Sequence, residues 1–439
     1  MRSLALLAAL ALSLSLVTPA GVGAAGTPAV APATPTDESA DRAAVTPTAV
    51  EQWATPTVVE QADSPNESNQ TNQTNQTRVL AVPESAVEES QIGGATLNLG
   101  PATEFNGNVT AVEVETEAVI AYVEAAETDS ERSRRIIQSS SEVETEIITL
   151  RDRQHAAIRA YNAGELDAEA FVIELATVAA KAEALETRVN RLNDQADEVE
   201  GFSLSRSAAI RYELRSFSGP VRDRAVDAIR GTQEPTQFFV TTGDQGYELT
   251  VVDNETYQRE AYRGAARSGD SGATMESDEA YNVTRDSYPE FVRSGDSSSS
   301  AAGTTNIVTI SGTDQELTAY VDSGSERVFK EYQEFSLSTY HSNDSATNTV
   351  GGISVVVNQT YPGGPMRVHI EDAESGDPID LAISLSQGQS DRITVGRTGD
   401  DGTLWTVSPR GSFTVLAVGD DTTAAYVETN STDAPAIDD

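Results

Sequence analysis

The strongest constraint on the fold is a periodic run of apolar residues between positions 131 and 200. In its second half these residues are spaced alternately by four and three positions, at Phe171, Leu175, Val178, Ala182, Leu185, Val189, Leu192, Ala196 and Val199. Such a heptad spacing places all of them along one side of an α-helix. The spacing therefore predicts a long amphipathic helix whose apolar seam needs a partner.

The first half of the run supplies that partner. It keeps the same rhythm more loosely, with polar Ser140 and Gln154 at two seam positions, through Ile136, Val143, Ile147, Leu150, Ile158 and Tyr161. Between the halves, Asn162-Ala163-Gly164 favours the left-handed backbone that ends a helix, and Asp167 is a good cap for the next one. We expect one long α-helical hairpin over 131–200, with each arm about 45 Å long.

The hairpin is one part of a chain whose 439 residues are too many for a single compact core. We predict a multidomain α+β protein. Its expected parts are a signal peptide (1–25), a disordered Thr/Pro/Asn-rich tether (26–90), an α-helical domain (91–231), a small duplicated α+β domain (235–335), an all-β sandwich (350–430) and a disordered acidic tail (431–439). Besides the hairpin, the helical domain should contain helices over 111–126, 202–217 and 220–231.

The α+β domain is interpreted as two copies of a three-strand unit. In each copy two strands flank a Gly- and Asp-containing turn, and a third strand follows; the predicted strands are 236–242, 247–252, 257–262, 306–311, 316–321 and 327–332. Both copies have a Glu-Leu-Thr second strand that closes on an aspartate, Asp253 or Asp322. Between the copies we expect a helix from Ser277 to about Val292 and a flexible loop over 294–302.

The last unit contains seven short strand-like runs at the spacing of a β-sandwich. The segments around 368–379, 399–404 and 408–413 resemble the transthyretin-like, carboxypeptidase-regulatory-like sandwich. Members of that family are mostly adhesive or spacer modules, so the resemblance implies a binding or spacing role for this unit.

The first residues predict export. Arg2 precedes an apolar run over 4–17, and Val22-Gly23-Ala24-Ala25 offers small residues for cleavage by signal peptidase. The alternative is an uncleaved anchor. No second apolar stretch of about twenty residues follows, so we expect no transmembrane anchor in the mature chain. The predicted location is extracellular, at the cell surface.

The tether and the later domains carry ten N-glycosylation sequons. Four of them abut in the tether, where the composition has too few large apolar residues to fold. The predicted acceptors are Asn66, Asn69, Asn72, Asn75, Asn108, Asn254, Asn282, Asn343, Asn358 and Asn430. Together with the export signal they predict a surface glycoprotein.

The net charge of −40 excludes one class of partner and indicates an environment. It results from 69 acidic and 29 basic residues, of which only Lys181 and Lys330 are lysines. A polyanion such as nucleic acid needs a basic face, so it is not an expected partner. At about 1 M salt the Debye length falls to about 3 Å, which screens this self-repulsion and fits a halophilic protein. Cysteine is absent, which excludes disulfides and thiolate chemistry.

From about Arg78 onward the chain resembles a set of haloarchaeal exported proteins. The resemblance is carried by the segments 161–164, 260–264, 326–332, 360–365 and 399–405. It implies a location at the cell surface and no particular activity.

Candidate chemistry is sparse. His155, His341 and His369 are far apart in sequence and lack metal or triad spacing. Asp400-Asp401 and Asp420-Asp421 are interpreted as turn residues, with weak Ca²⁺ binding as the alternative. Trp405 is interpreted as a core residue, with sugar stacking as the alternative. We therefore predict no catalytic residue, cofactor or metal site.

Two classes of function remain. The first is a secreted, N-glycosylated structural or interaction protein whose partners are other cell-surface proteins or glycans. The second is an extracellular enzyme or peptidase regulator that uses carboxylates of the 235–335 β layer. An enzyme needs converging carboxylates with perturbed pKa values in a concave pocket, whereas a spacer does not.

Overall fold

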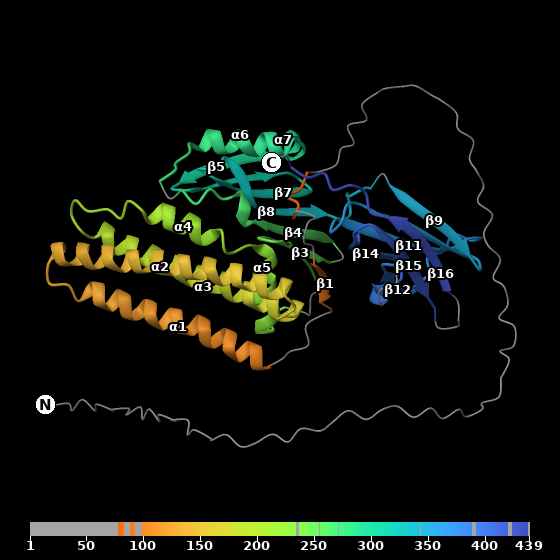
Figure 1. Ribbon diagram of the computed structural model, residues 1–439, viewed down its shortest axis with the longest axis horizontal. Helices are drawn as coiled ribbons and strands as arrows, with labels where there is room; N and C mark the ends of the chain where they lie inside the picture. Colours follow the sequence, from red (N-terminus) through yellow and green to blue (C-terminus); the bar gives the residue numbers. More distant parts are fainter. Residues whose placement is uncertain are drawn as a thin grey trace, which may run out of the picture. The chain divides into compact units, whose positions relative to one another are not determined.

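The computed structural model describes residues 78–82, 88–92, 99–233, 237–253, 255–270, 272–342, 344–388, 392–419 and 424–437 (Figure 1). The predicted signal peptide and most of the predicted tether lie outside these residues. Residues 78–82 and 88–90, which the prediction assigned to the disordered tether, are instead held by pairing and hydrogen bonds with distant segments. Helices occupy the N-terminal part of the described chain, and three sheets occupy most of the remainder.

Three long helices run side by side in the helical part (Figure 1). They are α1 (Leu99–Glu124), α2 (Asp129–Asn162) and α3 (Ala168–Asp197), followed by the shorter α4 (Ser207–Arg215) and α5 (Pro220–Arg230). The side chain of Thr128 caps α2 by accepting from the Glu131 N–H, and that of Asp167 caps α3 by accepting from the Ala170 N–H. The seam residues of α2 and α3 lie in three successive apolar clusters, and the middle cluster also contains residues of α4. Helix α1, which begins well before the predicted residue 111, packs mainly on α3.

One antiparallel sheet of eight strands follows, in the order β1-β2-β3-β4-β8-β7-β6-β5. Its strands are β1 (Glu88–Ile92), β2 (Phe238–Thr242), β3 (Gly246–Val252), β4 (Thr256–Arg263), β5 (Asp296–Ala302), β6 (Thr305–Ser311), β7 (Gln315–Asp322) and β8 (Arg327–Ser336). All six predicted strands are present. β4 and β8 pair at the centre, and β1 and β5 are the two edges.

Helices cover both faces of this sheet. On one face, Tyr247 and Leu249 share an apolar cluster with residues of α2, α3 and α5, such as Phe171 and Val221. On the other face, Val308 and Leu317 share a cluster with residues of α6 (Ser277–Ser287) and α7 (Pro289–Ser294). The sheet is therefore buried on both faces and forms the middle of three layers, with helices above and below it.

Two sequence predictions between the repeats are wrong. The helix expected from Ser277 to Val292 is interrupted at Tyr288, because Pro289 lacks the N–H that would continue it and starts α7 instead. The flexible loop expected over 294–302 is mostly strand β5, whose residues pair in continuous register with β6. A serine run has low strand propensity, and pairing with a neighbour overrides it.

The C-terminal unit is a sandwich of two four-stranded antiparallel sheets around one apolar core. One sheet contains β9 (Ser345–Val350), β10 (Ile353–Asn358), β11 (Pro365–Asp372) and β14 (Thr403–Val407). The other contains β12 (Ala382–Ser386), β13 (Ile393–Arg397), β15 (Ser412–Val418) and β16 (Ala424–Asn430). The seven predicted runs each overlap one of these strands, and β9 is an eighth.

The end of the chain departs from its prediction as a disordered tail. Ala436 forms a parallel bridge with Val79, and the Ile437 N–H donates to the Val79 carbonyl at 2.9 Å. The Ile437 side chain is buried in the cluster beneath α6 and α7. Two backbone hydrogen bonds with Val79 and the buried Ile437 side chain together hold residues 435–437 against residues 78–80.

Candidate functional site

The central strand pair of the large sheet carries two consecutive charged pairs, Arg259-Glu260 on β4 and Lys330-Glu331 on β8. Because side chains alternate between the faces of a strand, each pair places one charge on each face. All four side chains are at most 1% exposed. Since buried charges need compensating partners, the structure must supply them on both faces.

On the face covered by α2, α3 and α5, Glu260 binds two cations. Arg222 of α5 donates from Nε to Glu260 Oε1 at 2.7 Å, and Lys330 Nζ lies 3.4 Å from the same oxygen. Arg222 also donates to Gln154 of α2 at 3.2 Å, and Lys330 donates to the Ser216 carbonyl at 3.1 Å. We call this set, Gln154, Arg222, Glu260 and Lys330, the helix-side network.

The pKa values of the two strand residues in this network, Glu260 and Lys330, are both shifted, for different reasons. Burial raises the pKa of Glu260, but attraction by Arg222 and Lys330 outweighs burial and lowers the pKa overall. Burial also lowers the pKa of Lys330, to about 7, with Glu260 opposing the change. Glu260 is therefore held as a carboxylate, and its charge is balanced primarily by Arg222.

On the opposite face Arg259 binds two carboxylates. Its Nη2 donates to Glu248 Oε2 at 2.7 Å, and its Nη1 pairs with Glu331. The hydroxyl of Tyr288, at the junction of α6 and α7, donates to Glu331. Burial raises the pKa of Glu331, with Arg259 opposing the change. We call this set, Glu248, Arg259, Tyr288 and Glu331, the outer network.

The outer network reaches two segments that are distant in sequence. Arg259 Nη2 donates to the Leu80 carbonyl at 3.0 Å, which ties down residues 78–82. The Tyr257 hydroxyl donates to the Gly363 carbonyl at 2.8 Å, which ties down the β10–β11 connection of the sandwich. Gly363 has φ +81°, and a Cβ at this position would overlap the Glu248 carboxylate. Only glycine fits both the backbone conformation and this close approach.

A further buried carboxylate, that of Glu213, links α4 to the sheet. Glu213 accepts from Arg267 at 2.7 and 2.9 Å, from Arg151 of α2 at 2.5 Å and from the Thr305 hydroxyl of β6 at 2.7 Å. Burial raises its pKa, but the hydrogen bond from Arg267 and the two arginine charges lower it overall, to about 2. Glu213 is therefore ionised at any physiological pH.

These contacts determine what the carboxylates of the β layer are able to do. A general base must reach the proton that it abstracts, within hydrogen-bond distance of a substrate. Glu260 and Glu331 are inaccessible to solvent, and both are engaged by arginine. The arrangement joins layers of the protein through buried ion pairs. Within the described part of the chain, no group of three or more His, Asp or Glu residues is placed to hold a metal ion.

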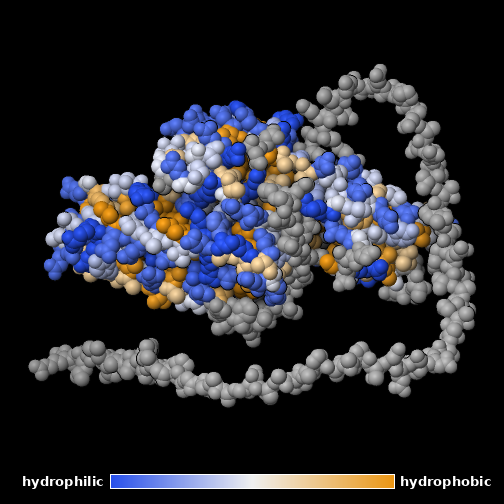
Figure 2. All heavy atoms as spheres, viewed as in Figure 1, coloured by the Kyte–Doolittle hydropathy of each residue, from blue (hydrophilic) through white to orange (hydrophobic). Residues whose placement is uncertain are grey.

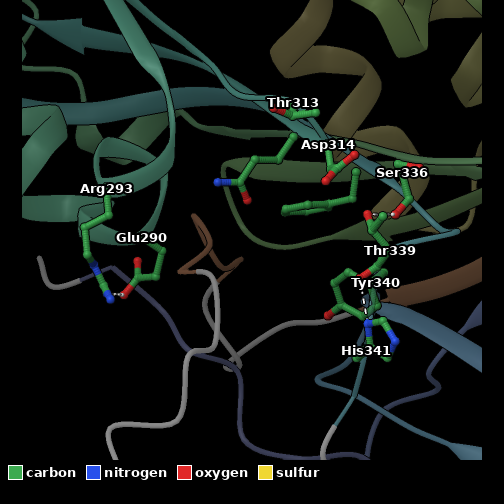
Figure 3. A pocket seen from close by; sticks show the side chains of 10 residues that line it. Glu290, Arg293, Thr313, Asp314, Ser336, Thr339, Tyr340 and His341 are labelled. Carbon is green, nitrogen blue, oxygen red and sulfur yellow. Dashed lines mark hydrogen bonds and ion pairs between the residues drawn. The ribbon is translucent and has the colours of Figure 1, made fainter.

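A separate hollow lies where α7, the β6–β7 turn and the end of β8 meet (Figure 3). It has a volume of about 580 Å³, and its lining includes Glu290, Arg293, Asp314, Tyr340 and His341. Arg293 and Glu290 form an ion pair of 3.7 Å on one side, while Tyr340 and His341 lie on the other side (Figure 3). The His341 ring engages the Thr339 carbonyl at 2.7 Å. This hollow is polar and open, and it lies apart from both networks.

The three histidines are not brought together. His155 contacts the Tyr262 hydroxyl at 3.1 Å, His341 lies in the hollow, and His369 lies 3.7 Å from Glu371 in the sandwich. Burial lowers the pKa of His155.

The other candidate residues are placed as follows. Trp405 is partly buried against the apolar cluster that the sheet forms with α6 and α7, where Tyr340 packs edge-on to its ring. Asp401 accepts from the Thr403 N–H at 3.0 Å, which is the geometry of a turn residue. Asp420-Asp421 lies outside the described residues.

Of the ten predicted glycan acceptors, four lie in described parts of the chain. Asn282 on α6 and Asn430 at the end of β16 are exposed, whereas Asn108 on α1 and Asn358 at the end of β10 are half-buried. The acceptors Asn66, Asn69, Asn72, Asn75, Asn254 and Asn343 lie outside the described residues.

The residues of the helix-side and outer networks were not predicted as a site from the sequence. The usable signal was a charged dipeptide inside a strand-like run, at Arg259-Glu260 and at Lys330-Glu331. A charged residue on the buried face of a strand indicates that an oppositely charged residue lies nearby. It does not identify that residue as Arg222, which lies 38 positions from Glu260.

Comparison with known families gives three matches along the chain. Residues 1–234, more than half of the chain, match the model of a domain of unknown function, DUF7096. The chain belongs to the DUF7096 family. Residues 238–341, which contain β2 to β8, match a second family of unknown function, DUF7094. No curated protein and no solved structure matches the chain.

The third match concerns the sandwich. Residues 344–426 match an archaeal fibronectin-III type-like domain, so this member of the DUF7096 family contains a β-sandwich of that kind. The resemblance to carboxypeptidase-regulatory-like sandwiches stays a prediction. None of the described helices combines the length and the apolarity needed to cross a bilayer.

Proposed function

We propose that this protein is a secreted, N-glycosylated cell-surface protein with a structural or interaction role. The observation that supports the proposal is that the buried charged residues of the large sheet form ion pairs with one another and with neighbouring layers. Glu248, Glu260 and Glu331 are buried and bound by arginine, and their networks join helices, sheet, residues 78–82 and sandwich. Because its buried charges join the layers to one another, the protein is suited to presenting a rigid surface outside the cell.

Export and glycosylation rest on the sequence, and one experiment tests both. We expect the native protein to be removed from intact cells by protease and to begin near Ala25 or Gly26. We also expect glycopeptides covering 66–75, and glycans on exposed Asn282 and Asn430. Recovery of an intracellular chain with Met1 and unmodified asparagines would contradict the proposal.

The rival proposal, an extracellular enzyme or peptidase regulator, is favoured by one feature. The open hollow is lined by Glu290, Asp314 and His341, which are the residue types of acid–base chemistry. If this rival is correct, a Glu290→Gln/Asp314→Asn variant loses an activity of the secreted fraction and stays folded. Cross-linking on intact cells that captures a surface protein or glycan equally well with this variant supports the structural role.

We also propose that the sheet arose by duplication and that the chain is halophilic. Duplication is supported by matched turns: Asp253 accepts from the Glu255 and Thr256 N–H groups, and Asp322 accepts from those of Gly324 and Ser325. Halophily is supported by the net charge of −40. Melting temperatures should fall steeply as NaCl or KCl is removed, and restoration by millimolar Ca²⁺ alone would instead indicate a metal site.

A further inference from the structure

The large sheet ends in β5, and the outer edge of this strand is open. β5 pairs with β6 on one side, and no described residue pairs with its other side. The first four side chains of β5 are exposed and the other three are half-buried. In the sandwich, by contrast, edge strand β9 lies beside β16, and edge strand β13 lies beside β14. An edge with free N–H and C=O groups is a template for another strand.

β5 also lacks the features that usually protect an edge. Its sequence, Asp296 to Ala302, contains no proline, lysine or arginine, and its pairing with β6 has no bulge. Asp296 is the single charged residue between positions 296 and 311, although 22% of the whole chain is charged. Figure 2 shows pale, weakly polar spheres where Figure 1 labels β5, beside the bluer surface of α6.

We propose that β5 pairs in antiparallel fashion with β5 of a second copy of this chain, about a twofold axis at Ser299. The two sheets would then continue into each other. This register places Asp296 opposite Ala302 of the other copy and Ser297 opposite Ala301, so no like charges face each other across the new pair. Small serine side chains at Ser298, Ser299 and Ser300 allow close approach and cross-strand hydrogen bonds.

The charge pattern favours this occupant over a basic partner. A basic peptide would find one carboxylate on the β5–β6 hairpin, whereas self-pairing needs no attraction between charges. Self-pairing does bring two α6 helices closer, with Asp278, Glu279 and Asp286 on each, and it joins two chains of net charge −40. The dimer should therefore form in molar salt and dissociate as salt is removed. This inference does not depend on the proposed function.

A single cysteine tests the register, because the chain has none of its own. Directly opposed residues of an antiparallel pair have Cα atoms about 4.5–5.5 Å apart, within disulfide range. In molar salt, the mature Ser299→Cys chain should oxidise to a covalent dimer. Ser141→Cys, an exposed position on α2, should not. A covalent dimer formed equally by both variants, or by Ser141→Cys alone, would overturn the proposal.

Sedimentation velocity tests the interaction without the cross-link. The unmodified chain should dimerise in molar salt. Ser299→Lys, which sets two lysines opposite each other, should weaken dimerisation at least tenfold, while Ser299→Thr should retain it. Circular dichroism of both variants confirms that the monomer is folded. A chain that stays monomeric in molar salt, or a dimer indifferent to Ser299→Lys, would overturn the proposal.

Discussion

The centre and the edge of the same sheet use charge in opposite ways. At the centre, β4 and β8 bury Arg259, Glu260, Lys330 and Glu331 among partners from both helical layers. At the edge, β5 and β6 carry only Asp296. The interior charges fix neighbouring layers in one arrangement, because each needs its partner in place. The uncharged edge imposes no such condition and leaves a surface on which a strand can add.

The largest loss of stability is expected when a charge at the centre of the sheet is removed. Glu260→Ala leaves Arg222 and Lys330 buried without their carboxylate, so it should lower the free energy of unfolding by about 3–5 kcal/mol. Denaturant titration measures the loss. Glu316→Gln, at an exposed position on neighbouring β7, is the matched control and should change stability little. Equal effects of the two variants would contradict a special role of the centre.

Acid should remove the stabilisation that the Glu213 carboxylate provides. The folded pKa of Glu213 is about 2 against an ordinary value of 4.5, so its contribution is fully present above pH 4.5 and is lost as the pH falls toward 2. The contribution at neutral pH is roughly 3 kcal/mol. Stability measured from pH 5 to pH 2 should fall less for Glu213→Gln than for the unmodified chain. Parallel curves would show that Glu213 is not held by Arg267.

A smaller loss of stability is expected at the contact between Gly363 of the sandwich and Glu248 of the large sheet. Gly363→Ala should cost about 1–3 kcal/mol, because the added methyl group overlaps Glu248 and the residue has a positive φ. Gly376→Ala has a similar φ of +75° but open space around it, so it isolates the backbone cost. Thermal melts of both variants give the difference. An equal loss in both would mean that the overlap with Glu248 does not matter.

The smallest effect belongs to the edge. Ser298→Lys on exposed β5 should change the stability of the monomer by less than about 0.5 kcal/mol. Denaturant titration in dilute protein checks this, with Ser298→Thr as the control. A loss comparable with that of Glu260→Ala would show that the edge is already part of the folded interior.

Local patterns predicted most of the elements in this molecule. The heptad spacing located α2 and α3, and alternation located six of the eight strands of the large sheet and seven strands of the sandwich. β5 was missed because Ser297 to Ser300 have no strand preference of their own and depend on β6. The tail was missed because its order rests on contacts with distant segments, namely backbone hydrogen bonds to residues 79, 360 and 411 and the buried Ile437 side chain.

The charge networks could not be predicted because their partners are set by tertiary structure. Arg259 and Glu331 are 72 positions apart, and Arg259 and Leu80 are 179 apart. A buried Glu260 indicates that a cation lies nearby, but many arginines would serve equally well. Choosing Arg222 requires knowing that α5 lies over β4.

The most direct test of the central claim replaces the whole charged part of the helix-side network. If Arg222, Glu260 and Lys330 serve to join layers, the triple substitution to methionine should recover most of the free energy of unfolding that Glu260→Met alone removes, because no unpaired charge remains. Denaturant titration of both variants in the same molar salt gives the comparison. A triple variant as unstable as the single one would contradict the claim that these charges act by compensating one another.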